Sequence, residues 1–155
     1  MARAPYQVLV IPFDDMADLR VAVLRRADMD AWQFVAGGGE EGETPLAAAR
    51  REAMEEIGAV GEPYPLDSRC SVPASVIRPE ARSHWPARTL VIPEYAFALR
   101  VKEGALTLSR EHTGAAWLSP EKAAHLLRYD SNRTALAELT ERVHRGWLAR
   151  AEDIP

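Results

Sequence analysis

The sequence is short of several features that would place it in other protein classes. It has one cysteine, Cys70, so no internal disulfide can form. No apolar run approaches the roughly 20 residues that span a membrane, and the first residues, MARAPYQVLVIPF, lack a signal-peptide core and a cleavage site. These absences predict a soluble protein of a reducing, cytoplasmic compartment with no membrane partner.

An excess of positive charge is also missing. The chain carries 19 Lys and Arg against 23 Asp and Glu, a formal net charge of -4. Because non-specific affinity for nucleic acids comes mostly from clustered Lys and Arg, this balance argues against a polymeric nucleic-acid partner and leaves a small phosphorylated ligand open. With 155 residues, 47% of them hydrophobic, the chain fits one domain over residues 1–155, as a monomer or a homodimer.

The pattern of apolar residues, turn residues and helix signals predicts mixed strands and helices. A helix at residues 45–57 has the clearest signals, because Thr44 can cap it, Pro45 suits its first position and Gly58 can end it. Strands are expected at residues 6–13, 20–24, 32–36, 66–72, 95–101 and 115–118, and further helices at about 120–127 and 132–150.

Three smaller expectations concern the rest of the chain. Asp130 and Ser131 are predicted to cap the last helix, whose apolar stripe ends at Trp147. The proline-rich segment 73–93 is a candidate lid or substrate loop. Cys70 is expected to be a small buried side chain.

Glutamates crowd one part of the helix at residues 45–57. At about 100° per residue, Glu52, Glu55 and Glu56 occupy an arc beside the apolar stripe. Two carboxylates about 5 Å apart repel by roughly 3 kcal/mol at an effective dielectric near 20, so three in a partly buried cleft raise their pKa values or recruit cations. A triplet of this kind taken alone is usually a solvated surface face, so its surroundings decide.

Two nucleotide-binding glycine motifs can be rejected in this segment. Gly37-x-Gly39-x-x-Gly42 has the spacing of a dinucleotide-binding turn, but the neighbouring glutamates would repel a pyrophosphate from the backbone amides. A phosphate-binding P-loop needs a lysine where Glu43 stands.

The whole string at residues 37–59 fits the pattern G-x5-E-x7-R-E-U-x-E-E-x-G-U, where U is apolar. Seven fixed identities at residue frequencies of about 6% coincide by chance with a probability of about 10⁻⁸. The string resembles the signature box of the Nudix hydrolases. The box residues with fixed identities are Gly37, Glu43, Arg51, Glu52, Glu55, Glu56 and Gly58.

This resemblance implies an α/β fold, an α/β/α sandwich around a mixed β-sheet in which the box forms a loop, a helix and a loop. It implies hydrolysis of a nucleoside diphosphate linked to another group, with Glu52, Glu55 and Glu56 holding Mg²⁺ or Mn²⁺. Arg51 would orient a glutamate and Glu43 would brace the loop against the helix, while Gly37 and Gly58 would be structural. Glu55 is the first choice of general base.

Residues outside the box resemble one branch of the family, the dihydroneopterin triphosphate and nucleoside triphosphate pyrophosphohydrolases. They are Trp32-Gln33, Glu111-His112 before Trp117-Leu118, and Ser131-Asn132-Arg133. The resemblance makes Glu111 a fourth metal ligand or the base, against the alternative of an acid in a surface loop. His112 either donates to a phosphate or is exposed.

Further alternatives stay open. Trp32 either stacks on a substrate ring or packs in the core, and Arg133 either binds a phosphate or pairs with a neighbour. An ADP-sugar or dinucleoside polyphosphate pyrophosphatase is the second candidate among the hydrolases. Pro73 lies fifteen residues past Gly58, near the position of a proline in family members of the ADP-ribose type. A regulator that binds a nucleotide without cleaving it is the alternative from a different class.

Overall fold

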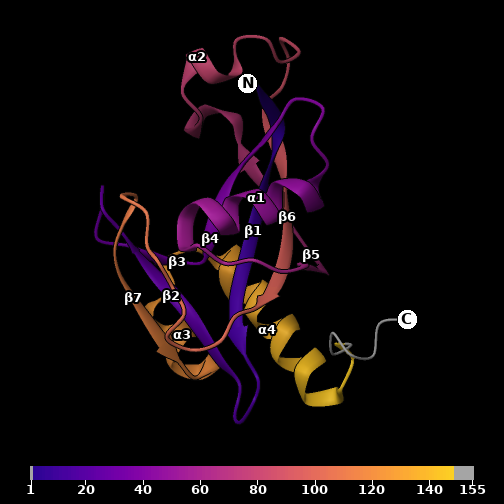
Figure 1. Cartoon of the computed structure of the whole chain (residues 1–155). Coiled ribbons are helices and arrows are strands. Elements are labelled where there is room, and N and C mark those ends of the chain that lie inside the picture. The colour runs from indigo at the N-terminus through magenta and orange to yellow at the C-terminus, as the bar shows by residue number, and fades with distance from the viewer. Residues whose placement is uncertain (1, 149–155) are drawn as a thin grey trace.

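A single mixed β-sheet organises the chain in the computed structural model, which describes residues 2–148 (Figure 1). The strands are β1 (Arg3–Asp14), β2 (Arg20–Arg26), β3 (Trp32–Gln33), β4 (Val35–Glu40), β5 (Tyr64–Pro73), β6 (Val91–Arg100) and β7 (His112–Leu118). The helices are α1 (Pro45–Ile57), the 3₁₀ turn η1 (Ala74–Val76), α2 (Pro79–Arg82), α3 (Pro120–Leu126) and α4 (Asp130–Arg145).

Strand β1 is the centre of the sheet. The order is β3-β2-β1-β6-β5, with β4 also paired to β1 and β7 to β2. One edge of β1 pairs in parallel with β6. The other edge is shared, because β4 pairs with its residues 3–10 and β2 with residues 13–14. On this side of β1 the sheet therefore has two branches, one formed by β4 and the other by β2, β3 and β7.

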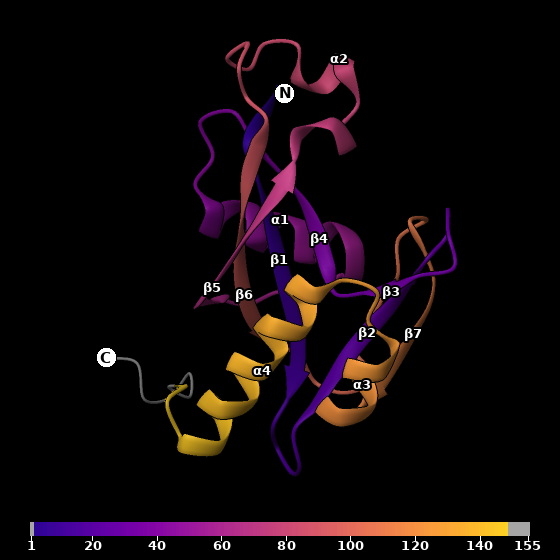
Figure 2. The ribbon, with the colours of Figure 1, turned by 180° about the vertical axis from the view of Figure 1, so that it is seen from behind.

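Helices cover both faces of the sheet, with α1 on one face and α3 and α4 on the other (Figures 1 and 2). Side chains of β1 alternate between the two cores, as a pleated strand requires. Val8 and Val10 pack with the buried side chains of α1, whereas Leu9 and Ile11 pack with those of α3 and α4. The predicted α/β/α sandwich with a mixed sheet is confirmed.

Helix α1 begins and ends where the local signals predict. Thr44 Oγ1 accepts a hydrogen bond from Ala47 N at 3.2 Å, and Pro45 takes the first position. Gly58 adopts a φ of 66°, a left-handed conformation that favours glycine. Its amide donates to Met54 O at 3.0 Å, so the last carbonyls of the helix are partly satisfied.

The predicted strand at residues 32–36 differs from the observed structure. It is split into β3 and β4, and β4 continues through the glycines to Glu40. Pairing with β1 causes this extension, since Val8 lies opposite Gly37 and Gln7 opposite Gly38. Tertiary pairing overrides the weak strand preference of glycine, and only residues 41–44 connect β4 to α1.

The start and the end of α4 also differ from expectation. Its N-cap is Tyr129, which makes no side-chain cap hydrogen bond, so the predicted capping by Asp130 and Ser131 is wrong. The helix ends at Arg145 because Gly146 turns left-handed with a φ of 70°. Trp147 lies beyond the helix and is 64% exposed rather than on its apolar stripe. Residues 149–150 of the predicted helix lie outside the described residues.

The proline-rich segment 73–93 contains η1 and α2, and β6 already begins at Val91. Trp85 is buried against Ala74 and Ile92, and its Nε1 donates to Arg3 O at 2.7 Å. Cys70 is only half-buried, contrary to the prediction, because it lies on edge strand β5. None of the helices within residues 2–148 has the length and apolar character to span a membrane.

Candidate active site

Three glycines of β4 allow large side chains to lie directly on its backbone. A Cβ at Gly37 would overlap the Glu52 carboxylate, and one at Gly38 would overlap the Arg3 guanidinium. At Gly39 it would overlap the Tyr6 ring. The glycines are therefore required for close approach rather than for a turn.

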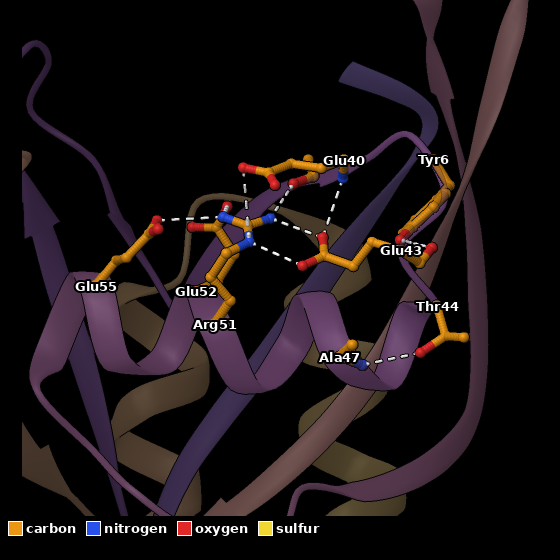
Figure 3. A network of polar contacts seen from close by, with 9 residues as sticks. Tyr6, Glu40, Glu43, Thr44, Ala47, Arg51, Glu52 and Glu55 are labelled. Carbon is orange, nitrogen blue, oxygen red and sulfur yellow. Dashed lines mark hydrogen bonds and ion pairs between the residues drawn. The ribbon is translucent and has the colours of Figure 1, made fainter. Parts of the chain in front are cut away.

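Arg51 joins the glycine strand to the acidic face of α1 (Figure 3). Its Nε and Nη2 donate to the two oxygens of Glu43 at 3.0 and 2.9 Å, and Nη2 also donates to Gly38 O at 2.9 Å. Its Nη1 lies 3.0 Å from Glu52 Oε1 and 3.2 Å from Glu55 Oε2. The hydrogen bonds that Arg51 donates to Glu43 raise the pKa of Arg51 and lower the pKa of Glu43.

Arg51, expected to orient a glutamate, and Glu43, expected to brace the loop against the helix, are thus in contact with each other. Glu43 Oε1 also accepts from Glu40 N at 3.0 Å, so the carboxylate holds the short connection before α1 as well as the guanidinium. Because two parallel charge-assisted hydrogen bonds fix orientation as well as distance, Arg51 has little rotational freedom.

Glu56 is the most buried acid of the box, with 3% of its surface exposed. Its Oε2 accepts from Ala36 N at 3.1 Å, and its carboxyl shares a hydrogen bond with that of Glu111. Burial first, then the hydrogen bond with Glu111 and the charge of Glu52, raise the pKa of Glu56 to about 10. Burial likewise raises the pKa of Glu52 to about 7, with Arg51 acting in the opposite direction.

Glu111 reaches Glu56 because the loop between β6 and β7 is fastened to the end of α1. Thr107 N donates to Ile57 O at 2.9 Å, and Ser109 N donates to Glu56 O at 3.0 Å. On the other side, Ala27 N donates to Glu111 O at 2.8 Å. These bonds satisfy helix carbonyls that would otherwise lack a partner, and they place a distant acid beside the box.

The donor set fits a hard divalent cation. Glu52, Glu56 and Glu111 act on one another's charge, and burial deprives the first two of solvent, so added positive charge would stabilise their ionised forms. Within residues 2–148, no three His, Cys, Asp or Glu side chains already stand in a geometry that could hold a metal ion. Arg51 draws Glu52 and Glu55 toward itself, so ligation requires these side chains to turn.

A cleft of about 940 Å³ opens beside Glu56 and Glu111. Its walls come from β1, β5 and β6, from the loops at residues 26–29 and 110–112, and from the start of α4. His112 lines the cleft and is buried, so it is not the exposed side chain of one alternative, and its contact with a phosphate stays a prediction. Burial lowers the pKa of His112. Its Nδ1 has no hydrogen-bond partner among the described residues.

Sequence reasoning missed the polar residues on the floor of the cleft, Arg3, Gln7 and Glu94. A signal existed for two of them. Gln7 lies in register with the buried series Leu9 and Ile11, and Glu94 interrupts an otherwise apolar strand. A polar side chain at a core position of a strand is a departure from alternation, and such departures concentrate at functional sites.

The two predicted substrate-binding residues do not line the cleft. Trp32 is half-buried and packs against the core beneath α3 and α4, while its neighbour Gln33 faces the cleft. Arg133 pairs with Asp130 and donates to Leu127 O. The geometry favours the packing alternative for Trp32 and the pairing alternative for Arg133.

Comparisons with known proteins agree on one family. The NUDIX domain model matches residues 4–139. Dihydroneopterin triphosphate diphosphatase of Escherichia coli strain K12 is 31% identical over 139 residues, which cover 88% of this chain and 92% of that protein.

Solved structures give the same answer. The crystal structure of a NUDIX hydrolase from Listeria monocytogenes has a TM-score of 0.78 and 43% identity, and covers 92% of this chain and 97% of its own. The E. coli dihydroneopterin triphosphate pyrophosphohydrolase has a TM-score of 0.74 and 28% identity, and covers 92% and 99%.

Proposed function

This chain belongs to the Nudix family and is a hydrolase of phosphoric anhydrides, and we propose that its substrate is a nucleoside triphosphate or a pterin triphosphate. We further propose that Mg²⁺ or Mn²⁺ is the cofactor, held by Glu52, Glu55, Glu56 and Glu111. The observation that carries this proposal is the meeting of Glu111 with Glu56 at the edge of a cleft that can hold a nucleotide.

The reaction requires water to attack a polyanion. When bound, a divalent ion neutralises phosphate charge and lowers the pKa of coordinated water. Arg51 holds Glu52 and Glu55 close to the glycine strand, so the two acids are restrained before any ligand arrives. Glu43 in turn restrains Arg51, which links the loop, the helix and the acids in one network.

Among the glutamates of the box, Glu55 is the best placed to act as the base. Its side chain is 57% exposed, against 12% for Glu52, so it can meet a water molecule in the open part of the site. A base must lie within hydrogen-bond reach of the proton it accepts. Glu56 is buried and shares a proton with Glu111, which suits a ligand better than an exchanging base.

The choice of substrate is supported by the relatives and by the size of the cleft. A volume of about 940 Å³ is within the range of small-molecule sites. The E. coli relative, which acts on dihydroneopterin triphosphate, covers 88% of this chain. Nucleoside triphosphates and this pterin triphosphate share a ring, a linker and a polyphosphate, and the cleft is lined by polar side chains as well as by Glu56 and Glu111.

Product analysis tests the proposal. Nucleoside triphosphates, dihydroneopterin triphosphate, ADP-ribose and a dinucleoside polyphosphate would be incubated with Mg²⁺ or Mn²⁺ and the released pyrophosphate measured. We expect pyrophosphate from triphosphates, and a loss of at least about 100-fold in kcat for Glu55→Gln. Glu121→Gln, a change of an exposed acid in α3, is the matched control. Binding without turnover of every compound would overturn the proposal.

A further inference from the structure

Glu94 is an unusual carboxylate. It lies in β6 at 5% exposure and lines the cleft. Its single hydrogen bond is from Gln7 Nε2 to Oε2 at 2.6 Å, and no Lys, Arg or His within residues 2–148 forms an ion pair with it. A buried acid without a cation is costly, and a carboxylate has about four acceptor positions. Within residues 2–148, most of its acceptor capacity is therefore unused, and the residue lines the cleft.

A short hydrogen-bonded chain orients this carboxylate. Arg3 Nη2 donates to Gln7 Oε1 at 3.5 Å, which turns the Gln7 amide so that its NH₂ group faces Glu94. Arg3 itself lies on the backbone of Gly38. Because the amide is oriented from one side, Gln7 holds Glu94 Oε2, and within residues 2–148 no hydrogen bond to Oε1 is found.

Sheet register fixes where Glu94 lies relative to the box. Glu94 is opposite Gln7, and Gln7 is opposite Gly38, so the three form one row across β6, β1 and β4. With neighbouring strands about 4.8 Å apart, Glu94 lies on the order of 10 Å from β4, the strand whose Gly37 lies against the Glu52 carboxylate of α1. This separation matches the reach of a nucleoside from the edge of its ring to its first phosphate.

We propose that Glu94, oriented by Gln7, selects substrates whose ring presents two adjacent N–H donors, the 2-amino-4-oxopyrimidine edge shared by guanine and pterin. This inference rests on the proposed triphosphate hydrolysis and names the ring class of its substrate. Such an edge offers a ring N–H and an exocyclic NH₂ side by side, which a carboxylate accepts with its two oxygens. Adenine and cytosine place an acceptor nitrogen beside their amino group, which the carboxylate would repel.

The decisive comparison is between two substrates that differ in one group. Inosine triphosphate is guanosine triphosphate without the 2-amino group, so it keeps the ring N–H and loses the second donor. For the unaltered protein with Mg²⁺ we expect kcat/KM to be at least about tenfold higher for the guanosine compound, as one charge-assisted hydrogen bond allows. Most of the difference should appear in KM, because the ring is distant from the reacting phosphates.

The variant Glu94→Gln keeps the shape and one acceptor oxygen but turns an NH₂ group toward the ring donors. We expect it to lower kcat/KM for guanosine triphosphate at least about tenfold and to bring the guanosine-to-inosine ratio to about one or below. Glu121→Gln should leave the ratio unchanged. Binding of GMP and IMP, which carry no pyrophosphate bond, gives the same comparison by calorimetry without turnover.

These measurements separate the two proposals. Hydrolysis of triphosphates with equal efficiency for the guanosine and inosine compounds, unaltered in Glu94→Gln, would overturn the ring selection alone. Absence of hydrolysis together with GMP binding that depends on Glu94 would overturn the enzymatic proposal and support the ring contact. A preference for adenosine triphosphate would also refute the role of Glu94.

Discussion

The buried carboxyl of Glu56 makes the stability of the metal-free protein depend on pH. In the fold its pKa is raised to about 10 from 4.5, so between these values the folded protein holds a proton that the unfolded chain has released. The stabilisation is fully present below pH 4.5 and is lost as the pH rises through the folded pKa. Each pH unit in this interval therefore lowers the free energy of unfolding by up to about 1.4 kcal/mol.

Glu56 dominates the interval from pH 7 to pH 9. Burial lowers the pKa of His112 from 6.5, so His112 has largely finished titrating by pH 7. Glu52, with a folded pKa of about 7, is half titrated there and adds about 0.4 kcal/mol. Two pH units give an upper value of about 2.7 kcal/mol for Glu56, and sharing of the proton with Glu111 reduces it, so we expect about 1 to 3 kcal/mol. Such a loss is a substantial part of the usual 5–15 kcal/mol of a small domain.

The assay is urea unfolding in the presence of a chelator at pH 7, 8 and 9. Glu56→Gln keeps an oxygen for Ala36 N and an NH₂ group for Glu111, so it should remove the slope while preserving the fold. Glu121→Gln should keep the slope. Added Mg²⁺ should stabilise the unaltered protein more at pH 9 than at pH 7, because the cation displaces the proton. Equal slopes in Glu56→Gln and the unaltered protein would refute the reasoning.

Three further predictions address the neighbouring residues. Glu111→Gln should slow turnover at least about tenfold with unchanged urea unfolding at pH 7, and unchanged kinetics would return Glu111 to a surface role. Gly37→Ala should displace the Glu52 carboxylate and lower kcat at least about tenfold, whereas Gly114→Ala, where nothing lies within 4 Å and φ is not positive, should not. Arg51→Lys should cost about 1–3 kcal/mol of stability by urea unfolding because lysine cannot reproduce the paired bonds to Glu43; no loss would mean that this pair carries little energy.

The parts of the site that the sequence predicted are those with local causes. Thr44, Pro45 and Gly58 act within one turn of α1, so its ends could be predicted to the residue. The resemblance gave Arg51 and Glu43 separate roles, and their contact with each other is found only in the structure. Glu111 has no local signal of this kind, and only the resemblance to the family pointed to it. Its position depends on loop bonds to α1 that no periodicity contains.

The remaining differences come from long-range pairing. The strand preference of glycine is poor, yet β4 runs through three glycines because β1 offers it a hydrogen-bonding partner. Trp32 was a candidate for stacking on a substrate as well as for packing, and the pairing of β3 with β2 places it against the core. The row of Gln7 and Glu94 exists only through register between β1 and β6, which a single sequence does not specify.

The register of the strands also explains why the acids of α1 and the chain from Arg3 to Glu94 lie on opposite sides of the sheet. Gly37 and Gly38 are neighbours in β4, so their open backbone positions face opposite sides of the sheet. Glu52 of α1 occupies the position at Gly37, and Arg3 of the cleft occupies the one at Gly38. The acids that we propose to hold a cation are thereby on the side of α1, while the chain from Arg3 to Glu94 lies on the side of α4. A substrate that reaches both must pass the divided edge of β1, where Glu56 and Glu111 meet, and its phosphates rather than its ring then lie among the acids.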